Sequence, residues 1–289
     1  MAQYLWYVTR RVRNKIAHAL FGDTVKGKPS WYQQHALKQN YSIKCGALNV
    51  GGLQKASKRM QIEDQSPDLL ALCATHLQAH LEHSESQQFD DYHCFWSPNP
   101  SDRHFGGVGM LIKKSSFWQV KLIKWNPDHP CYTFYKDNRL LAVQLWFGRG
   151  GTSLLAYVAY GPSGACWEPS KKAYFHNMLA AIQEDRTSKG PIPAILLGDF
   201  NPEISDPHNL RFALHSRYWC DTRDHSSFEM QSKPTCHKGK DGSRIDHIFV
   251  SPNDMSFNFH VQKLTEFKKI IHSSPPKLSS PLRRNPYQI

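Results

Sequence analysis

Several features that mark common protein classes are missing from this 289-residue sequence. It has no uninterrupted apolar run near the roughly 18 residues that a membrane-spanning helix needs, and no secretory-type apolar segment. Its seven cysteines are an odd number and form no Cys-x-x-Cys pair, which argues against a disulfide framework and against a zinc site. We therefore expect no transmembrane segment and a reducing compartment, that is, an intracellular location, nuclear or cytoplasmic.

Acidic residues are scarce at both ends of the chain, so the ends carry most of the net charge of +12. Residues 1–41 sum to +6 and residues 263–289 to +5, and the 221 residues between them contribute only +1. Lys and Arg near phosphates release counterions and gain affinity for nucleic acid. The charge therefore favours DNA or RNA as a partner, held mainly through the ends, although solvated charge on tails is also common.

The N-terminal segment has apolar residues at three- and four-residue steps over residues 2–21, with Arg10, Arg11 and Arg13 among them and no acid before Asp23. This pattern predicts a basic amphipathic helix. Three interpretations stay open: a helix that docks on the domain, an arm that contacts phosphates or a membrane surface, and a mitochondrial presequence. In the second, the three arginines are nucleic-acid contacts.

The middle of the chain alternates short apolar strands with helical segments, which predicts an α/β domain. Strands are expected at 43–50, 69–73, 107–113, 139–147, 153–160, 192–197 and 248–251, and helices at 53–62 and in a segment capped by Ser170 that buries Phe175, Met178, Leu179 and Ile182. Phe257, Phe259 and Val261 alternate with polar residues as in a further strand. We divide the chain into a basic helical extension and linker (1–41), one domain (42–272) and a basic, Pro-rich, irregular tail (273–289).

Two carboxylates flank predicted strands. Gly198-Asp199-Phe200-Asn201 follows an apolar run, and Asp246 precedes another. Asp199 could accept a proton from an attacking water or orient it, and Asn201 could donate its amide hydrogens to a phosphate. A turn in which both side chains bond the local backbone is an equally good interpretation.

Two further polar residues end predicted strands. Asn49 supplies an amide oxygen, and Tyr160, before Gly161-Pro162, supplies a phenol that can hydrogen-bond a phosphate. Taken singly, each is more typical of a structural residue.

Six short motifs stand in order between residues 42 and 262. They are Leu48-Asn49-Val50-Gly51-Gly52-Leu53, Pro67-Asp68-Leu69-Leu70-Ala71-Leu72-Cys73-Ala74-Thr75-His76-Leu77, Gly106-Gly107-Val108-Gly109, Tyr160-Gly161-Pro162, Gly198-Asp199-Phe200-Asn201 and Ser243-Arg244-Ile245-Asp246. This set resembles the endonuclease/exonuclease/phosphatase superfamily, and its Gly-Gly-Val and Ser-Arg-Ile-Asp motifs are closest to the endonuclease domains of non-LTR retroelements. The resemblance implies a four-layer sandwich of two packed mixed β-sheets flanked by helices, and a phosphodiesterase that depends on Mg²⁺ or Mn²⁺.

The resemblance also implies roles for five residues. Asn49 would help to bind metal and phosphate, and Tyr160 would contact the phosphate. Asp199 would activate the nucleophile and Asn201 would orient it. Asp246 corresponds to the carboxylate that orients a late catalytic histidine in the family.

Two departures from the family pattern matter. Ala74 occupies the position of the glutamate that is the family's principal metal ligand, and Mg²⁺ relies on one or two hard carboxylates. The closing Ser-Asp-His of the family is also missing, and its region reads Ile271-His272-Ser273-Ser274. His272 is a possible displaced histidine. Arg244 is either a partner of Asp246 or a phosphate contact.

The sequence therefore predicts a metal-dependent phosphodiester hydrolase, and specifically a nucleic-acid endonuclease, whose activity is impaired by Ala74 and by the altered C-terminal end. The alternative is a non-catalytic pseudoenzyme or retroelement relic that binds nucleic acid or a protein partner. A phosphatase acting on soluble or lipid phosphates shares the same fold and chemistry. The sequence indicates no oligomeric state.

Overall fold

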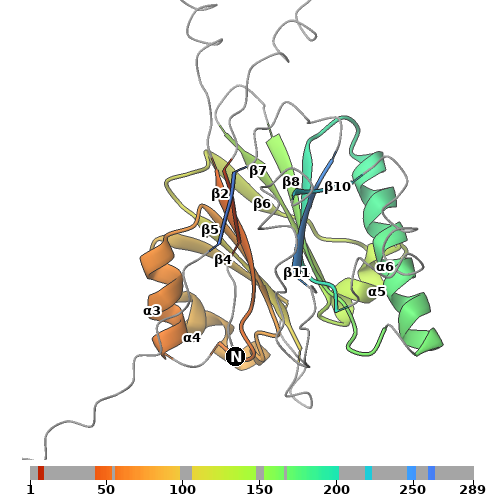
Figure 1. Cartoon of the computed structure of the whole chain (residues 1–289), viewed down its shortest axis with the longest axis horizontal. Helices are drawn as coiled ribbons and strands as arrows, with labels where there is room; N and C mark the ends of the chain where they lie inside the picture. Colours follow the sequence, from red (N-terminus) through yellow and green to blue (C-terminus); the bar gives the residue numbers. More distant parts are fainter. Residues whose placement is uncertain are drawn as a thin grey trace, which may run out of the picture.

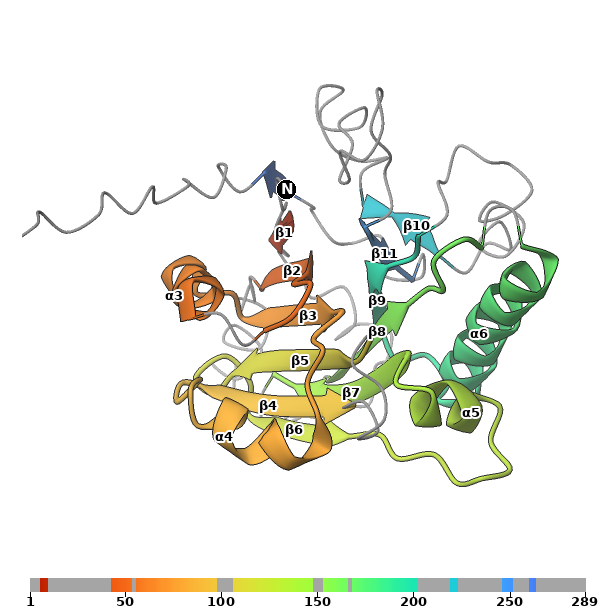
Figure 2. The same cartoon turned by 90° about the horizontal axis from the view of Figure 1, so that it is seen from below.

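A computed structural model of the chain describes residues 6–9, 43–53, 56–97, 106–147, 153–165, 168–201, 219–222, 246–251 and 260–263. In this part of the chain, two β-sheets pack face to face, and helices cover the outer face of each (Figures 1 and 2). The four-layer α/β sandwich predicted from the sequence is therefore confirmed.

Among the described residues, each sheet has six strands. The first has the order β12-β1-β2-β3-β5-β4, with β1 (Trp6–Thr9), β2 (Lys44–Asn49), β3 (Leu69–Cys73), β4 (Tyr92–Ser97), β5 (Val108–Lys113) and β12 (His260–Lys263). The second has the order β10-β11-β9-β8-β7-β6, with β6 (Gln119–Leu122), β7 (Leu140–Trp146), β8 (Ser153–Tyr160), β9 (Ala194–Asp199), β10 (Cys220–Asp221) and β11 (Asp246–Val250). Both sheets are mixed, because β2–β3 and β8–β9 are parallel pairs and the other pairs are antiparallel.

Each parallel pair is joined by a helix, as a parallel connection requires. Helix α3 (Ala56–Gln65) links β2 to β3, and α6 (Pro169–Ser188) links β8 to β9. The first sheet is also covered by the short η1 (Ala79–Leu81) and α4 (Glu82–Ser86), and the second by α5 (Cys131–Lys136) (Figure 1). No helix among the described residues is long and apolar enough to cross a bilayer.

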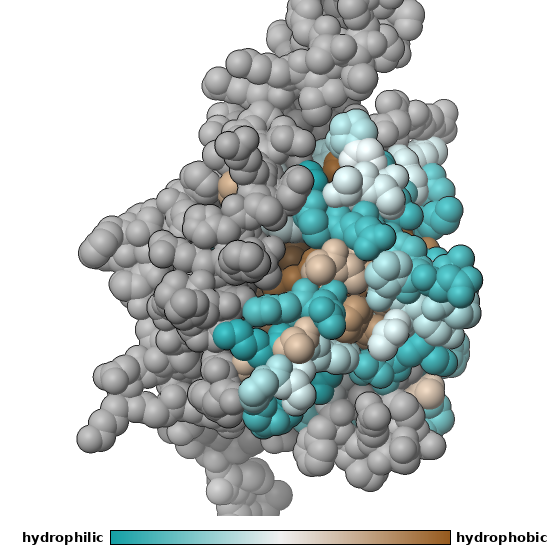
Figure 3. All heavy atoms as spheres, turned by 90° about the vertical axis from the view of Figure 1, so that its right-hand side faces the viewer, coloured by the Kyte–Doolittle hydropathy of each residue, from teal (hydrophilic) through white to brown (hydrophobic). Residues whose placement is uncertain are grey.

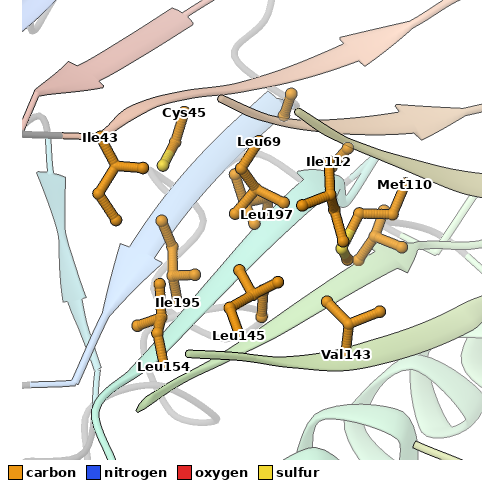
Figure 4. Close-up of a cluster of buried hydrophobic side chains, with 14 of the residues drawn as sticks. Ile43, Cys45, Leu69, Met110, Ile112, Val143, Leu145, Leu154, Ile195 and Leu197 are labelled. Carbon is orange, nitrogen blue, oxygen red and sulfur yellow. The ribbon is translucent and has the colours of Figure 1, made fainter. Parts of the chain in front are cut away.

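The main core lies between the two sheets. Alternate residues of the strands point into it, so that Leu69 and Ile112 of the first sheet face Val143 and Leu197 of the second (Figure 4). This period of two is the pattern of a strand with different layers on its two faces. The strand residues between them, such as Leu70 of β3, pack instead against the outer helices, which gives each sheet a second apolar interface.

Helix α6 buries the side chains of Phe175, Met178, Leu179 and Ile182, as the sequence predicts. Its start differs from the prediction. Ser170 is not the cap, because Pro169 is the first helical residue and Glu168 precedes it without a side-chain capping bond. The fixed φ of proline suits a first helical position, and this outweighs the preference of serine for the cap. The described surface on this side of the molecule is largely hydrophilic (Figure 3).

The predicted N-terminal helix is wrong at residues 6–9, which form strand β1 between β2 and β12. Trp, Tyr, Val and Thr are strand-forming residue types, and the strands on both sides of this segment give its backbone groups hydrogen-bond partners. The rest of the expected helix, with Arg10, Arg11 and Arg13, lies outside the described residues. The division of the chain into an extension, a domain and a tail stays a prediction.

Candidate functional site

The strand ends bring together the five residues singled out in the sequence. Tyr160 at the end of β8 is the register partner of Asp199 at the end of the parallel strand β9. Asp246 begins the antiparallel strand β11 and pairs with Asp199 from the other side. Asn49, at the end of β2 in the opposite sheet, reaches Asp199 through its side chain. The site therefore lies where the two sheets meet at one edge.

Asp199 is the centre of this arrangement, and it is 1% exposed. The Asn49 Nδ2 donates to Asp199 Oδ2 at 2.5 Å, and the backbone N–H of Asn201 donates to Oδ1 at 3.0 Å. Both carboxylate oxygens are thus held, one from each sheet layer. Bonds from N–H donors stabilise the ionised form of a carboxylate, which is the form a general base needs.

Asn201 has its own structural partner. Its side-chain Nδ2 donates to the carbonyl of Gly161 at 2.7 Å, and its backbone has a left-handed φ of +62°. Asn tolerates this conformation better than most residues. The Asp199 side chain therefore bonds the local backbone, as in the turn interpretation, whereas the Asn201 side chain bonds the distant Gly161. The roles of both residues toward water and phosphate stay predictions.

The main chains of β8 and β9 approach each other closely at the site. A Cβ on Gly198 would lie 1.9 Å from the carbonyl oxygen of Ala159, and a Cβ on Gly161 would lie 2.2 Å from that of Phe200. The N–H of Gly161 donates to the carbonyl of Asp199 at 2.8 Å. Glycine at both positions is what permits this approach, and the approach fixes the spacing of the two strand ends.

Arg139 is a site residue that the sequence analysis missed. Its Cζ lies 4.5 Å from the centre of the Tyr160 ring, and its Nη1 donates to the Gly161 carbonyl at 3.3 Å. A signal for it was present: the predicted strands 139–147 and 153–160 form an antiparallel hairpin, which places Arg139 beside Tyr160. The guanidinium brings a permanent positive charge to the site.

Tyr160 remains a neutral phenol at physiological pH. Burial, and then the charge of Asp199, raise the pKa of Tyr160 to about 12, although the charge of Arg139 acts in the opposite direction. A protonated phenol is a hydrogen-bond donor for a phosphoryl oxygen.

Cys73, at the end of β3, is a second residue that the sequence analysis did not assign to the site. Its Sγ accepts the backbone N–H of Asp199 at 3.4 Å and donates to the carbonyl of Ala159 at 3.6 Å. Burial, and then the charge of Asp199, raises the pKa of this thiol well above its ordinary value. The neutral thiol therefore links the first sheet to the two site strands of the second.

The described residues do not fit a bound Mg²⁺ or Mn²⁺. Ala74 contributes no ligand at the position of the family glutamate, and no group of three or more His, Cys, Asp or Glu in the described ranges could hold a metal ion. Asn49 and Asp199 are bonded to each other, and the Asn49 Oδ1 also accepts the N–H of Gly51 at 3.1 Å.

Part of the predicted site lies outside the described residues. This applies to His272, the possible displaced histidine, and to Arg244. Arg10, Arg11 and Arg13, the expected nucleic-acid contacts, also lie outside the described residues. Their roles stay predictions.

The fold is similar to those of several solved structures. The catalytic domain of Xenopus laevis APE2 matches with a TM-score of 0.56 and 16% identity, covering 78% of this chain and 94% of that one. The AP endonuclease LMAP from Leishmania major matches with a TM-score of 0.54 and 15% identity, covering 71% and 78%. The human nocturnin catalytic domain, solved with a bound sulfate anion, matches with a TM-score of 0.51 and 19% identity, covering 71% and 79%.

These identities are low, so the likeness to the solved structures establishes the fold alone. A search of the curated proteins finds no match. The sequence itself matches a family model over residues 47–261, a span that includes all five strand-end residues of the site. The chain belongs to the Endonuclease/Exonuclease/phosphatase family.

Proposed function

We propose that this chain is a phosphodiester hydrolase of its family that acts on nucleic acid as an endonuclease, with hydrolysis impaired by Ala74. The observation that supports the proposal most strongly is the setting of Asp199. Its carboxylate is held by Asn49 and Asn201 where the two sheets meet, with Tyr160 and Asp246 as its register partners. Family membership supports the reaction class.

In this proposal the residues divide the work of hydrolysis. Asp199 accepts a proton from the attacking water, and Asn49 and Asn201 keep its oxygens in place. Tyr160 donates its O–H to a phosphoryl oxygen, and the charge of Arg139 beside it stabilises negative charge on the phosphoryl group. Asp246 would orient a histidine that protonates the leaving oxygen, and His272 is the candidate for that histidine.

The proposed substrate is nucleic acid because the two ends of the chain carry +6 and +5. Two of the structures with the same fold are named AP endonuclease and APE2, which makes DNA a natural first substrate. The retroelement-type motifs Gly106-Gly107-Val108 and Ser243-Arg244-Ile245-Asp246 favour endonucleolytic action. The proposed location is intracellular, in the nucleus or cytoplasm, with mitochondria as the alternative if the N-terminal segment is a presequence.

A second candidate function is binding without catalysis. The observation in its favour is Ala74, together with the poor fit of the described site to the divalent ion on which the family reaction depends. A pseudoenzyme would keep the phosphate contacts of Tyr160 and Arg139 and lose hydrolysis.

The two candidate functions, hydrolysis and binding without catalysis, predict different effects of Ala74→Glu. We would measure nicking of supercoiled plasmid and cleavage of labelled DNA and RNA with added Mg²⁺ or Mn²⁺. Ala74→Glu is expected to raise the rate at least about tenfold, because it restores a hard carboxylate ligand. Ala79→Glu is the matched control, since Ala79 is exposed at the start of η1 and gains the same charge.

Asp199→Ala is the second arm of this experiment. In the Ala74→Glu background it is expected to lower the rate by about 100-fold or more, the scale on which a group acting in the transition state contributes. Asp64→Ala, an exposed carboxylate on α3, controls for loss of charge. Cleavage that persists in Asp199→Ala would refute the role of Asp199 as the proton acceptor. If no variant cleaves DNA or RNA, binding without catalysis is left as the candidate function.

A further inference from the structure

Lys58 of α3 uses its ammonium group in an unusual way. Its Nζ donates to three successive backbone carbonyls, those of Val50, Gly51 (3.2 Å) and Gly52 (2.8 Å). A protonated lysine has three N–H donors and no acceptor, so this set satisfies the group completely. We call these three carbonyl oxygens the carbonyl cradle.

The carbonyl cradle depends on two glycines. Gly51 and Gly52 have left-handed φ values of +51° and +92°, which turn successive carbonyls toward one side. The turn is fixed to the neighbouring strand, because the N–H of Gly52 donates to the carbonyl of Ala74 at 2.8 Å and that of Leu53 to the carbonyl of Thr75 at 2.9 Å. Three converging carbonyl dipoles repel one another unless a cation lies between them.

The same turn carries Asn49. The N–H of Gly51 donates to Asn49 Oδ1 at 3.1 Å, and the other end of that amide donates to Asp199 at 2.5 Å. One bonded path therefore runs from the Lys58 ammonium through the turn and the Asn49 amide to the carboxylate at the centre of the site. His76 lies against Gly52, and burial followed by the charge of Lys58 lowers its pKa.

We infer that Lys58 is a positioning residue: its ammonium fills the carbonyl cradle, holds the turn at residues 50–52, and so fixes the Asn49 amide that orients Asp199. The catalytic part of this inference depends on the proposed function. The positioning part depends only on the contacts above. Lys114, by comparison, donates to the exposed carbonyl of Asp90 at 2.6 Å.

Amide hydrogen exchange measured by NMR tests the positioning part in the full-length chain. Lys58→Met keeps most of the apolar stem and removes the ammonium, and exchange of the Gly51 N–H and the Asn49 side-chain NH₂ is expected to accelerate about tenfold or more. Lys58→Arg, which keeps the charge, is expected to restore most of the protection. Lys114→Met is the matched control, because it removes a lysine that bonds one exposed carbonyl.

Chemical rescue adds a readout that general destabilisation would not produce. In Lys58→Ala, added methylammonium is expected to enter the carbonyl cradle and slow Gly51 exchange again, with no such effect in Lys114→Ala. Unchanged exchange at Gly51 and Asn49 in Lys58→Met, or an equal change in Lys114→Met, would overturn the inference. So would the absence of rescue by both arginine and methylammonium.

An activity measurement separates this inference from the proposed function. If Ala74→Glu cleaves DNA, adding Lys58→Met is expected to lower kcat about tenfold with little change in KM, because the residue acts through Asn49 and not on the substrate. A rise in KM with kcat unchanged would overturn the positioning role. If no variant cleaves, the proposed function fails, and the exchange experiments still decide whether Lys58 positions Asn49.

Discussion

Two buried carboxylates lie on either side of strand β8, and they differ in their hydrogen-bond donors. Toward the helices, Tyr157 donates its O–H to Asp185 of α6 at 2.8 Å. Three residues along the same strand, Tyr160 is the register partner of Asp199 at the site. Asp185 is 0% exposed and Asp199 is 1% exposed, so burial alone does not distinguish them.

The difference lies in the donors. Asp185 also accepts the Trp125 indole N–H at 3.0 Å, lies 3.2 Å from His129 Nε2, and lies 3.6 Å from Lys189 Nζ. Because Trp125 and Tyr157 are themselves buried, this cluster ties α6, the segment before α5, and β8 together. We call it the Asp185 cluster.

Two donors to Asp199, by contrast, are the amide of Asn49 and the backbone N–H of Asn201, and both residues are partly exposed near strand ends. Such donors can exchange partners with water or substrate at small cost. The comparison teaches that the Asp185 carboxylate is bonded to buried donors, whereas the Asp199 carboxylate is bonded to donors on residues that solvent reaches.

The largest effect should come from Asp185→Ala. It leaves the buried Trp125 and Tyr157 donors without an acceptor, and we expect the free energy of unfolding to fall by about 3–5 kcal/mol, the scale for breaking a buried charged network. Urea unfolding followed by circular dichroism measures it. Asp64→Ala should change stability by less than about 0.5 kcal/mol, and a similarly small loss for Asp185→Ala would abolish the distinction.

Stability at alkaline pH should test how strongly the surroundings of Asp199 keep the neighbouring Tyr160 protonated. The folded-state pKa of about 12 lies above the ordinary value of 10, so the unfolded chain loses the proton first and stability falls as pH rises from 10 toward 12. Below pH 10 this contribution is complete and constant. Between pH 9 and pH 11 we expect Tyr160 to account for about 1.3 kcal/mol of lost stability.

Urea unfolding of the wild type and of Tyr160→Phe at the two pH values isolates this contribution, since the other tyrosines are common to both. The phenylalanine variant should show the shallower decline. Equal declines would mean that Tyr160 ionises in the folded protein as readily as in the unfolded chain.

Asp199→Ala should lower the free energy of unfolding by only about 1 kcal/mol, because its partly exposed donors regain water. It should nevertheless remove the hydrolysis proposed for the site. The same urea unfolding measurement applies. A loss of unfolding free energy equal to that of Asp185→Ala would show that the two carboxylates stabilise the fold to the same extent.

Lys189→Met should have the smallest effect. Lys189 is 38% exposed and its Nζ lies 3.6 Å from Asp185, so solvent screens the pair and we expect a change of at most about 0.5 kcal/mol. Thermal unfolding at low and high salt measures it. A larger, salt-sensitive loss would show that Asp185 depends on its charged neighbour more than on Trp125 and Tyr157.

The sequence was sufficient to predict the meeting of Asn49, Tyr160, Asp199, Asn201 and Asp246. Each of these residues stands at one end of an apolar strand or, in the case of Asn201, two residues beyond it. Strand ends collect at sheet edges whatever the details of the loops. The position of Arg139 beside Tyr160 could also have been predicted from the sequence, because the register of a hairpin follows once its two strands are recognised.

Other features depend on partners that no local pattern reveals. Strand β1 has apolar spacing that also suits a helix, and only its pairing with β2 and β12 selects the strand. The Asp185 cluster joins Trp125, His129 and Tyr157 to a helix far along the chain. Strands β4 and β6 were missed as well, since they lie at sheet edges where their patterns are weak.

The backbone at Ala74 has an evolutionary consequence. Its carbonyl accepts the N–H of Gly52 and its neighbour Thr75 donates to the carbonyl of Gly107, so the main chain holds this corner without help from the side chain. The side chain at position 74 can therefore change while these two main-chain bonds stay in place. Under the proposed function, a lineage could lose the metal ligand at this position without losing the backbone structure of this corner.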